Sequence, residues 1–324
     1  MSTTVERQLT PTGVVVSHAE ANSDEWYAQR DRGIGSSDIP PILGLSNYAS
    51  AAHVWARKLG RIPRDEAGRA AQWGHLLEPV IAGEWARRHG TTVRTVPTLR
   101  HVEHPHHMAA LDRLVDRCPD GAGDCALEVK FQSAWKAGSW RDDVPDAYLA
   151  QVSWQLHVTG LDHIHVVALL DQRDVDRIVV REAEVIDYTV REAESFWQHV
   201  LTETPPPVDS AAMLLDLLER LHPERSGAVE VDRTLVAEIR ASYEAAHAEA
   251  KAAGERKDAA KAALLELLGG GEIATVDGIP VATYTSVTRT DVDRDRLRKA
   301  HPDVWDDVTS QSTSRRFTWK KATI

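Results

Sequence analysis

The stretch that decides the fold is Leu111-Asp112-Arg113-Leu114-Val115, followed after a loop by Ala126-Leu127-Glu128-Val129-Lys130. Both pieces have the composition of β-strands, and the loop contains the turn-forming Asp120-Gly121-Ala122-Gly123-Asp124. The pattern therefore predicts a hairpin. Because side chains alternate across a strand, Glu128 and Lys130 share one face, and the hairpin brings Asp112 beside Glu128.

Two carboxylates and an ammonium group at one strand end suit metal-assisted chemistry on a phosphate. Carboxylate oxygens are the ligands that Mg²⁺ prefers. Lys130 would orient or deprotonate the attacking water, or neutralise charge that develops on a phosphate. The alternative is a solvated salt bridge on an exposed strand, and these residues alone leave that alternative open.

Composition limits the class of protein. The 324-residue chain is 42% hydrophobic and 27% charged, which is typical of a soluble globular protein. Its length fits a core domain of roughly 200 residues with a smaller appendage. No run approaches the ~18 apolar residues of a membrane span. The N-terminal residues also lack the layout of a signal peptide. We therefore expect a cytoplasmic protein.

Cysteine content and charge exclude further classes. The two cysteines, Cys118 and Cys125, are too few for a disulfide framework, a four-cysteine zinc site or an iron–sulfur cluster. The net charge of −11 argues against nucleic-acid binding over the whole surface. A locally basic channel remains compatible with that charge.

The first part of the chain is expected to be an irregular leader over residues 1–22, followed by helices. A helix begins near Asp24 with Ser23 or Asp24 as its N-cap. The segment 33–38, Gly-Ile-Gly-Ser-Ser-Asp, leads into another helix start, which serves either as an anion site or for plain capping. A third helix, over 73–88, places Glu78 on an inward face, with Pro79 expected in its first turn. Glu78 would pair with a metal or an arginine, and both alternatives stay open.

The remaining core elements complete an α/β arrangement. Strands are expected at 92–96 and 107–111, and the histidine-rich segment 101–107 between them is expected to be a surface turn rather than a zinc site. A helix over 146–159 places Tyr148, Gln151 and Gln155 on one face. Strands at 163–170 and 177–185 and a helix at 189–201 follow, which predicts a central mixed sheet flanked by helices.

The C-terminal part is expected to be a separate extension. Thr204-Pro205-Pro206-Pro207 predicts a stiff boundary, so that residues 23–204 form the core and 205–231 a linker and helix. Residues 232–324 would form a helical and α+β extension. It would contain a long helix (232–268), a hairpin (273–276 and 281–287), a short helix (292–300) and a last strand (315–319).

Several motifs, taken in order, resemble one family. They are Arg30 with Gly35-Ser36-Ser37-Asp38, Trp73-Gly74 with Glu78, Ala110-Leu111-Asp112, Leu127-Glu128-Val129-Lys130 and Tyr148-Leu149-Ala150-Gln151-Val152. This order and spacing are similar to those of the phage-lambda-type exonucleases, or YqaJ-like viral recombinases, of the PD-(D/E)xK nuclease superfamily. The resemblance covers roughly residues 24–200. One departure is Arg113, which follows Asp112 where the family has glycine, and it leaves local backbone shape and DNA contacts open.

The resemblance implies roles for individual residues. Glu78, Asp112, Glu128 and the backbone carbonyl of Val129 would bind one or two Mg²⁺ or Mn²⁺ ions. Lys130 would position or activate the water, and Gln151, supported by Tyr148, would orient Lys130 or the scissile phosphate. A pocket for a DNA 5′-phosphate would comprise Arg30, Ser36 and Ser37.

The resemblance also implies an activity and partners. The expected reaction is metal-dependent 5′→3′ exonuclease digestion of linear duplex DNA, which leaves single-stranded tails for phage-type recombination. Expected partners are double-stranded DNA ends, a single-strand annealing recombinase and further copies in a homo-oligomeric ring, a trimer. A phage or prophage protein in a bacterial cytoplasm would fit. The alternatives are an endonuclease or other DNA-processing nuclease of the superfamily, and a non-catalytic DNA-binding scaffold.

Overall fold

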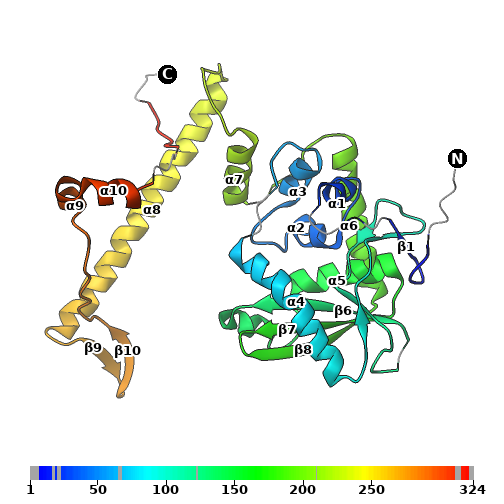
Figure 1. The fold of residues 1–324 in the computed structure, drawn as a ribbon. Coiled ribbons are helices and arrows are strands. Elements are labelled where there is room, and N and C mark those ends of the chain that lie inside the picture. Colours follow the sequence, from blue (N-terminus) through cyan, green and yellow to red (C-terminus); the bar gives the residue numbers. More distant parts are fainter. Residues whose placement is uncertain are drawn as a thin grey trace. The chain divides into compact units, whose positions relative to one another are not determined.

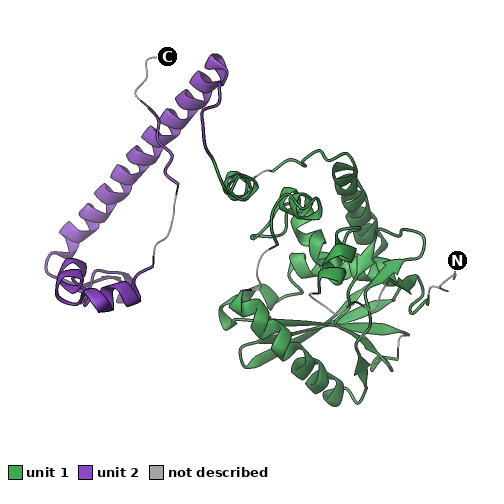
Figure 2. Cartoon of the chain, turned by 45° about the horizontal axis from the view of Figure 1, so that its top comes forward, with its two compact units in different colours: residues 1–225 green, residues 226–324 purple. Residues whose placement is uncertain are grey.

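The structure is a computed structural model that describes residues 7–16, 19, 23–64, 68–121, 123–208, 210–310 and 315–320 (Figure 1). Residues 1–6, 17–18 and 20–22 of the expected leader and Ala122 of the expected turn lie outside the described residues. The chain divides into two compact units, Met1–Arg225 and Ser226–Ile324 (Figure 2).

The first unit is built on a five-stranded mixed sheet with strand order β2-β5-β6-β7-β8. Its strands are β2 (Val93–Arg94), β5 (Arg113–Val115), β6 (Cys125–Gln132), β7 (His163–Leu170) and β8 (Arg173–Val180). The predicted β5–β6 hairpin is confirmed, with Arg113 opposite Leu127 and Val115 opposite Cys125. Strands β6 and β7 pair in parallel while the other pairs are antiparallel, which confirms the predicted mixed α/β class.

Two helices cover opposite faces of this sheet, and the alternation along β6 explains why. Cys125, Leu127 and Val129 pack in one cluster with Trp85 of α4 (Arg69–Arg88). Ala126 packs in a second cluster with α5 (Asp146–Thr159), and Glu128 faces the same helix. Every second residue of β6 thus points to the same layer, so the strand has no solvent face at its centre.

Helix α5 forms the crossover between the parallel strands β6 and β7, after the short helix η2 (Ala134–Trp140). Its bounds are those predicted, and it ends at Gly160, whose φ of 71° suits a left-handed cap. Helix α6 (Ala183–Leu201) follows. Strand β8 begins at Arg173 rather than 177, because the turn after β7 is tighter than expected. It ends at Val180 rather than 185, so α6 begins at Ala183 rather than 189.

A small second sheet corrects the expectation of an irregular leader. Strand β1 (Gly13–Val15) pairs with β3 (Leu99–His101), which pairs with β4 (Met108–Ala109). Helix α1 (Asp24–Arg30) is capped by Ser23, as predicted. Then come η1 (Ser36–Asp38), α2 (Ile39–Ile42) and α3 (Ala51–Lys58). The sequence reasoning missed α3, whose Val54 and Trp55 are buried in the core.

Pro79 lies inside α4, not in its first turn as predicted, because the helix already begins at Arg69. Proline has no backbone N–H, so the carbonyl of His75 lacks its usual donor four residues later. Packing of Ile81 and Trp85 against the sheet holds the helix together across this position.

The first unit continues past the proline-rich segment. Leu217 of α7 (Ala211–Leu221) is buried in the main core, so the compact unit ends at Arg225 rather than at the prolines. Among the described residues, no helix has the length and apolar content needed to cross a membrane.

The second unit contains the predicted long helix, α8 (Arg233–Leu268), and then the hairpin β9 (Ile273–Val276) and β10 (Ile279–Thr283). Helices α9 (Arg294–Ala300) and α10 (Pro302–Val308) follow, and α10 was not predicted. Strand β10 begins two residues earlier than expected. The predicted strand at 315–319 is wrong, because this segment has no ladder partner, and its Phe317 and Trp319 rings pack on Tyr243.

Candidate active site

The centre of the candidate site is the contact between Asp112 and strand β6. Asp112 directly precedes β5, and its Oδ2 accepts the backbone N–H of Val129 at 2.7 Å. This bond holds the Asp112 carboxylate beside Glu128, whose residue surface is only 2% exposed. The hairpin thus brings together the two carboxylates that the sequence predicted to be neighbours.

Glu128 is held by three side chains from β6 and α5. Lys130 Nζ donates to Glu128 Oε1 at 2.5 Å, and Gln151 Nε2 donates to the same oxygen at 2.6 Å. Gln155 Nε2 donates to Oε2 at 2.7 Å. Gln155 was not among the predicted site residues. Its position four residues after Gln151, on the same helix face, was the signal that could have identified it.

The electrostatics of this group depend on its burial. Burial raises the pKa of Asp112 well above its ordinary value, and neighbouring Glu128 raises it further, against the opposing effect of Lys130. Burial alone would lower the pKa of Lys130, but Glu128 and Asp112 outweigh it, so this pKa is raised. The raised pKa of Lys130 favours its ammonium form, which suits its contact with Glu128.

Glu78 of α4 is paired with Arg113. Arg113 Nη1 lies 2.5 Å from Glu78 Oε1 and also donates to the backbone carbonyl of Asp112. Arg113 thus places a guanidinium in contact with both the Glu78 carboxylate and the backbone of Asp112. Of the two alternatives for Glu78, this structure contains the arginine pair.

Tyr148 of α5 supports Lys130 through its ring. Lys130 Nζ lies 4.9 Å from the centroid of the Tyr148 ring. The ring stacks on Trp140, and Gln132 donates to its hydroxyl group. The aromatic face fixes one side of the ammonium group while Glu128 and Gln151 fix the other.

A cavity of about 660 Å³ gives access to these groups. Its lining includes Glu78, Asp112, Glu128, Lys130 and Gln151. A neighbouring cavity of about 730 Å³ has part of its lining in common with the first and extends to Ser37 and Arg57. The residues that line both cavities are Tyr48, Gln132, Trp135, Lys136, Tyr148 and Gln151.

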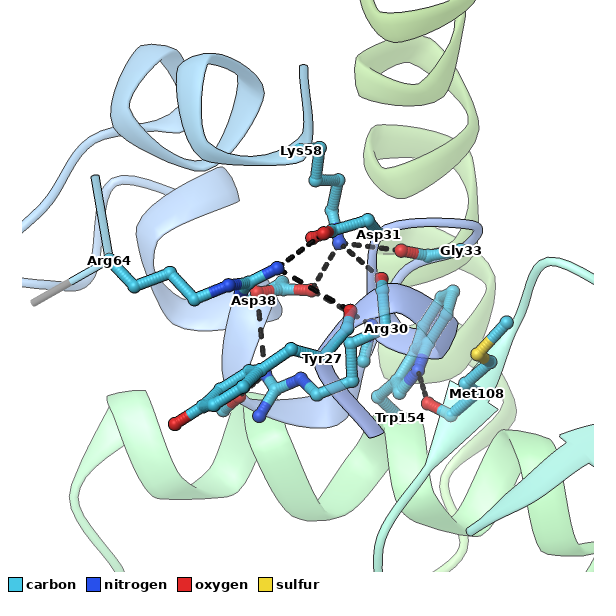
Figure 3. Close-up of polar contacts among 11 residues, drawn as sticks. Tyr27, Arg30, Asp31, Gly33, Asp38, Lys58, Arg64, Met108 and Trp154 are labelled. Atoms are coloured by element: carbon cyan, nitrogen blue, oxygen red, sulfur yellow. Dashed lines mark hydrogen bonds and ion pairs between the residues drawn. The ribbon is translucent and has the colours of Figure 1, made fainter. Parts of the chain in front are cut away.

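Arg30, one of the predicted phosphate-binding residues, belongs to a separate ionic cluster with Asp38 and Lys58 (Figure 3). Arg30 Nη2 donates to Ser37 Oγ at 2.6 Å and lies 3.7 Å from Asp38 Oδ1. Lys58 Nζ lies 2.8 Å from Asp38 Oδ2 and donates to the carbonyl of Gly33 at 2.5 Å. Burial by itself would raise the pKa of Asp38, but Lys58 and Arg30 outweigh it and lower the pKa to about 2.

Capping in this loop is the task of Asp38 rather than of Ser36 or Ser37. Asp38 Oδ2 accepts the N–H of Gly35 at 2.9 Å and so takes the capping role. Ser37 is exposed and adjoins the Arg30 guanidinium, whereas Ser36 is buried and covered. Gly33 packs so closely on the His106 carbonyl that a Cβ atom would lie 2.4 Å from its oxygen. This close approach fixes the path of the loop.

The histidine-rich segment is a turn with exposed residues at its centre, as expected, but the histidines at its two ends are not on the surface. His101 and His107 are buried, and His107 Nδ1 lies 2.9 Å from His157 Nε2 of α5. Burial lowers the pKa of His107 to about 2 and that of His157 to about 4, with neighbouring histidines adding to the effect. Donor atoms of His104, His107 and Glu194 lie within 4.8 Å of one another, as do those of His101, Glu103 and His104. Either group has a spacing that could hold a metal ion.

Comparison with known proteins confirms the expected resemblance. Residues 25–162 match the model of the YqaJ-like viral recombinase domain. The chain is 28% identical to the uncharacterized protein YqaJ of Bacillus subtilis (strain 168), over 94% of this chain and 96% of that protein.

Solved structures of exonucleases are also similar. The alkaline exonuclease LHK-Exo from Laribacter hongkongensis is 21% identical with a TM-score of 0.47, over 56% of this chain and 94% of that chain. A phage-related exonuclease from Haemophilus somnus 129PT is 16% identical with a TM-score of 0.40, over 53% of this chain and 96% of that one.

Proposed function

We propose that this protein, whose residues 25–162 match the YqaJ-like viral recombinase domain, is a metal-dependent DNA exonuclease. It digests one strand of linear duplex DNA from the 5′ end and leaves a single-stranded tail for recombination. The observation that carries the proposal is the half-buried Asp112 and the buried Glu128, which lie together with Lys130 in the wall of one cavity.

The donor set fits a hard divalent cation. Glu78, Asp112 and Glu128 offer carboxylate oxygens, and the carbonyl of Val129 lies beside them on β6. Burial and then the neighbouring Glu128 carboxylate raise the pKa of Asp112, so a bound cation would stabilise the pair of carboxylates. These four residues would hold Mg²⁺ or Mn²⁺, which supplies Lewis acidity and lowers the pKa of bound water.

The protein's own residues orient and stabilise the reacting phosphate. The Lys130 ammonium group, fixed by Glu128, Gln151 and the Tyr148 ring, offsets negative charge that develops on the scissile phosphate. Gln151 holds both Glu128 and Lys130, so it sets their relative positions. The raised pKa of Lys130 favours its ammonium form, so charge stabilisation is the role that we assign to it.

The 5′-phosphate anchor is assigned to Arg30 and Ser37. Ser37 lines the cavity that shares residues with the catalytic one, so a strand end can reach both. Arg30 is pre-oriented by Asp38 and by the Trp26 ring, 4.6 Å from its guanidinium carbon. The buried Ser36 supports the loop rather than touching the phosphate.

Digestion of three substrates with Mg²⁺ tests the proposal. Linear duplex DNA with a 5′-phosphate should be degraded rapidly, the same DNA with a 5′-hydroxyl slowly, and a closed circle not at all. Cutting of the circle would instead identify an endonuclease. Inactivity on all three would identify a non-catalytic scaffold.

A matched pair of variants tests the anchor. Arg30→Gln should abolish the preference for the 5′-phosphate, whereas Arg32→Gln, an exposed arginine two residues away, should retain it. Equal loss in both variants would mean that the effect is one of general charge.

The proposal extends to assembly. A homo-oligomeric ring, a trimer, would enclose the DNA, and a single-strand annealing recombinase would take up the tail. Sedimentation of the full chain and co-purification with an annealing protein test these two points, and a monomer that binds no such protein would count against both.

A further inference from the structure

A second cluster of metal-ligating side chains lies on the other face of β6. Cys118, in the loop between β5 and β6, meets Cys125 at the start of β6 and His163 and His165 of β7. Their donor atoms, one from each side chain, all lie within 4.8 Å of one another. None of the four residues takes part in the proposed nuclease chemistry.

From this geometry we propose that Cys118, Cys125, His163 and His165 bind a structural zinc ion. In a tetrahedral site with Zn–S of about 2.3 Å and Zn–N of about 2.0 Å, neighbouring donors lie roughly 3.3–3.8 Å apart. Cys118 Sγ lies 3.1 Å from His163 Nε2 and 3.8 Å from His165 Nε2. The donors are therefore already near the spacing that zinc requires.

The backbone arranges the three strand residues without strain. Cys125 and His163 are direct partners in the parallel β6–β7 ladder, so their side chains stand side by side. His165 follows two residues after His163 and shares its face of the sheet. The loop then needs to deliver only Cys118 to complete the site.

Burial and charge favour metal binding at these residues. Cys125 is 0% exposed, His163 4% and His165 2%, so a thiol and two imidazoles occupy positions where aliphatic residues are usual. Two thiolates and two neutral imidazoles around Zn²⁺ give a complex of zero net charge, which suits this interior. Binding releases the two thiol protons to solvent.

Surrounding groups fix the ligands in place. The His165 ring packs 4.9 Å from the Trp85 ring of α4, which limits its rotation. The Asp120 carboxylate lies 3.3 Å from His165 Nε2 and must release that nitrogen when the metal binds. Asp120 is 41% exposed at its side chain and can turn to solvent.

A zinc ion here would fasten the β5–β6 loop to the sheet. The loop connects the strand that follows Asp112 with the strand that carries Glu128, three residues after Cys125. The site would therefore be structural. It would bind a soft metal between β6 and α4, whereas Glu128 of the nuclease site faces α5 on the other side of the sheet.

Metal analysis of the purified full-length protein tests the proposal. Expressed with zinc and kept reduced, the chain should retain about one zinc ion. Cys118→Ser should lose it, and this half-buried loop residue is the least disruptive of the four to replace. Asp120→Asn keeps all four donors and should retain the zinc. Glu128→Gln should retain it as well, which separates this ion from any metal at the nuclease site.

Cobalt substitution gives a readout that does not depend on activity or on zinc content. The Co²⁺-loaded protein should show the charge-transfer absorption of a thiolate–cobalt bond, and Cys118→Ser should weaken it. A wild-type protein without bound zinc, or cobalt bound without that absorption, would overturn the proposal. A Cys118–Cys125 disulfide in the reduced preparation, detected by mass spectrometry, would overturn it as well. None of these outcomes bears on whether the protein digests DNA.

Discussion

Arg113 offers the sharpest test of the candidate site, because its guanidinium occupies one of the proposed metal ligands. In Arg113→Met the aliphatic part of the side chain is kept while the contact with Glu78 is lost. We expect the metal to bind more tightly, since Glu78 no longer has to leave a cation before it can coordinate.

The magnitude follows from the geometry of the pair. A hydrogen bond to a charged group contributes about 1.5–3 kcal/mol. The lower end applies here, because the Glu78 side chain is 26% exposed and solvent screens it. About 1.4 kcal/mol corresponds to a tenfold change in affinity. The dissociation constant for Mn²⁺ should therefore fall about tenfold.

Calorimetric titration with Mn²⁺ measures this change in affinity directly. Because no DNA is present, a contact between Arg113 and DNA cannot contribute to the result. Arg94→Met is the matched control. Arg94 lies on β2, the strand next to β5, and pairs with Asp116. Its replacement changes the net charge by the same amount as Arg113→Met. It should leave the Mn²⁺ affinity within twofold of wild type.

A double variant isolates the pair. In Glu78→Gln the arginine no longer faces a carboxylate, so adding Arg113→Met should give no further gain in affinity. Unchanged or weaker Mn²⁺ binding in Arg113→Met alone would refute the argument that the guanidinium competes with the metal. An equal gain in Arg94→Met would assign the effect to net charge.

Three further predictions follow from the contacts described. Glu128→Gln should abolish DNA cleavage while the melting temperature stays within a few degrees, measured by digestion of linear duplex and by circular dichroism; retained turnover would remove the proposed mechanism. Lys58→Met should lower the free energy of unfolding by about 3 kcal/mol, because it leaves the buried Asp38 carboxylate without its closest cation; a loss under about 1 kcal/mol in urea titrations would contradict this. Burial lowers the pKa of His157 from 6.5 to about 4. Between these two pH values the imidazole is protonated in the unfolded chain but neutral in the folded chain. The free energy of unfolding should therefore decrease as the pH falls from 6.5 to about 4. His157→Gln should flatten this dependence, and an unchanged slope would show that His157 does not cause it.

Local sequence patterns predicted the central hairpin and the helix that crosses over it. The alternation along β5 and β6 and the bounds of α5 depend on residues within each element, which the sequence displays directly. The neighbours Asp112 and Glu128 followed from the same alternation. The placement of Gln151 near Lys130 required only the helical period in addition.

Partners distant in sequence were harder to predict. Lys58, 20 residues from Asp38, ends the short helix α3, which the sequence analysis did not predict, and its partner could not be read from local sequence. The histidine-rich segment looked polar enough for a surface turn. His107 at its end is nevertheless buried, because His157 of α5, 50 residues away, provides the matching polar partner. Likewise, the ion pair between Arg113 and Glu78 depends on how α4 lies over the sheet, which a local sequence pattern does not predict.

The parallel pairing of β6 with β7 has a consequence for the order of folding. The two strands meet only after the crossover through α5 has been closed, and such long-range pairing is among the slow steps of folding. Gln151 and Gln155, which hold Glu128, belong to that same crossover. A chain that has formed only its β5–β6 hairpin therefore has its acidic residues but lacks the amides that orient them. During refolding, nuclease activity should return with the last and slowest phase, after most of the apolar surface has been covered.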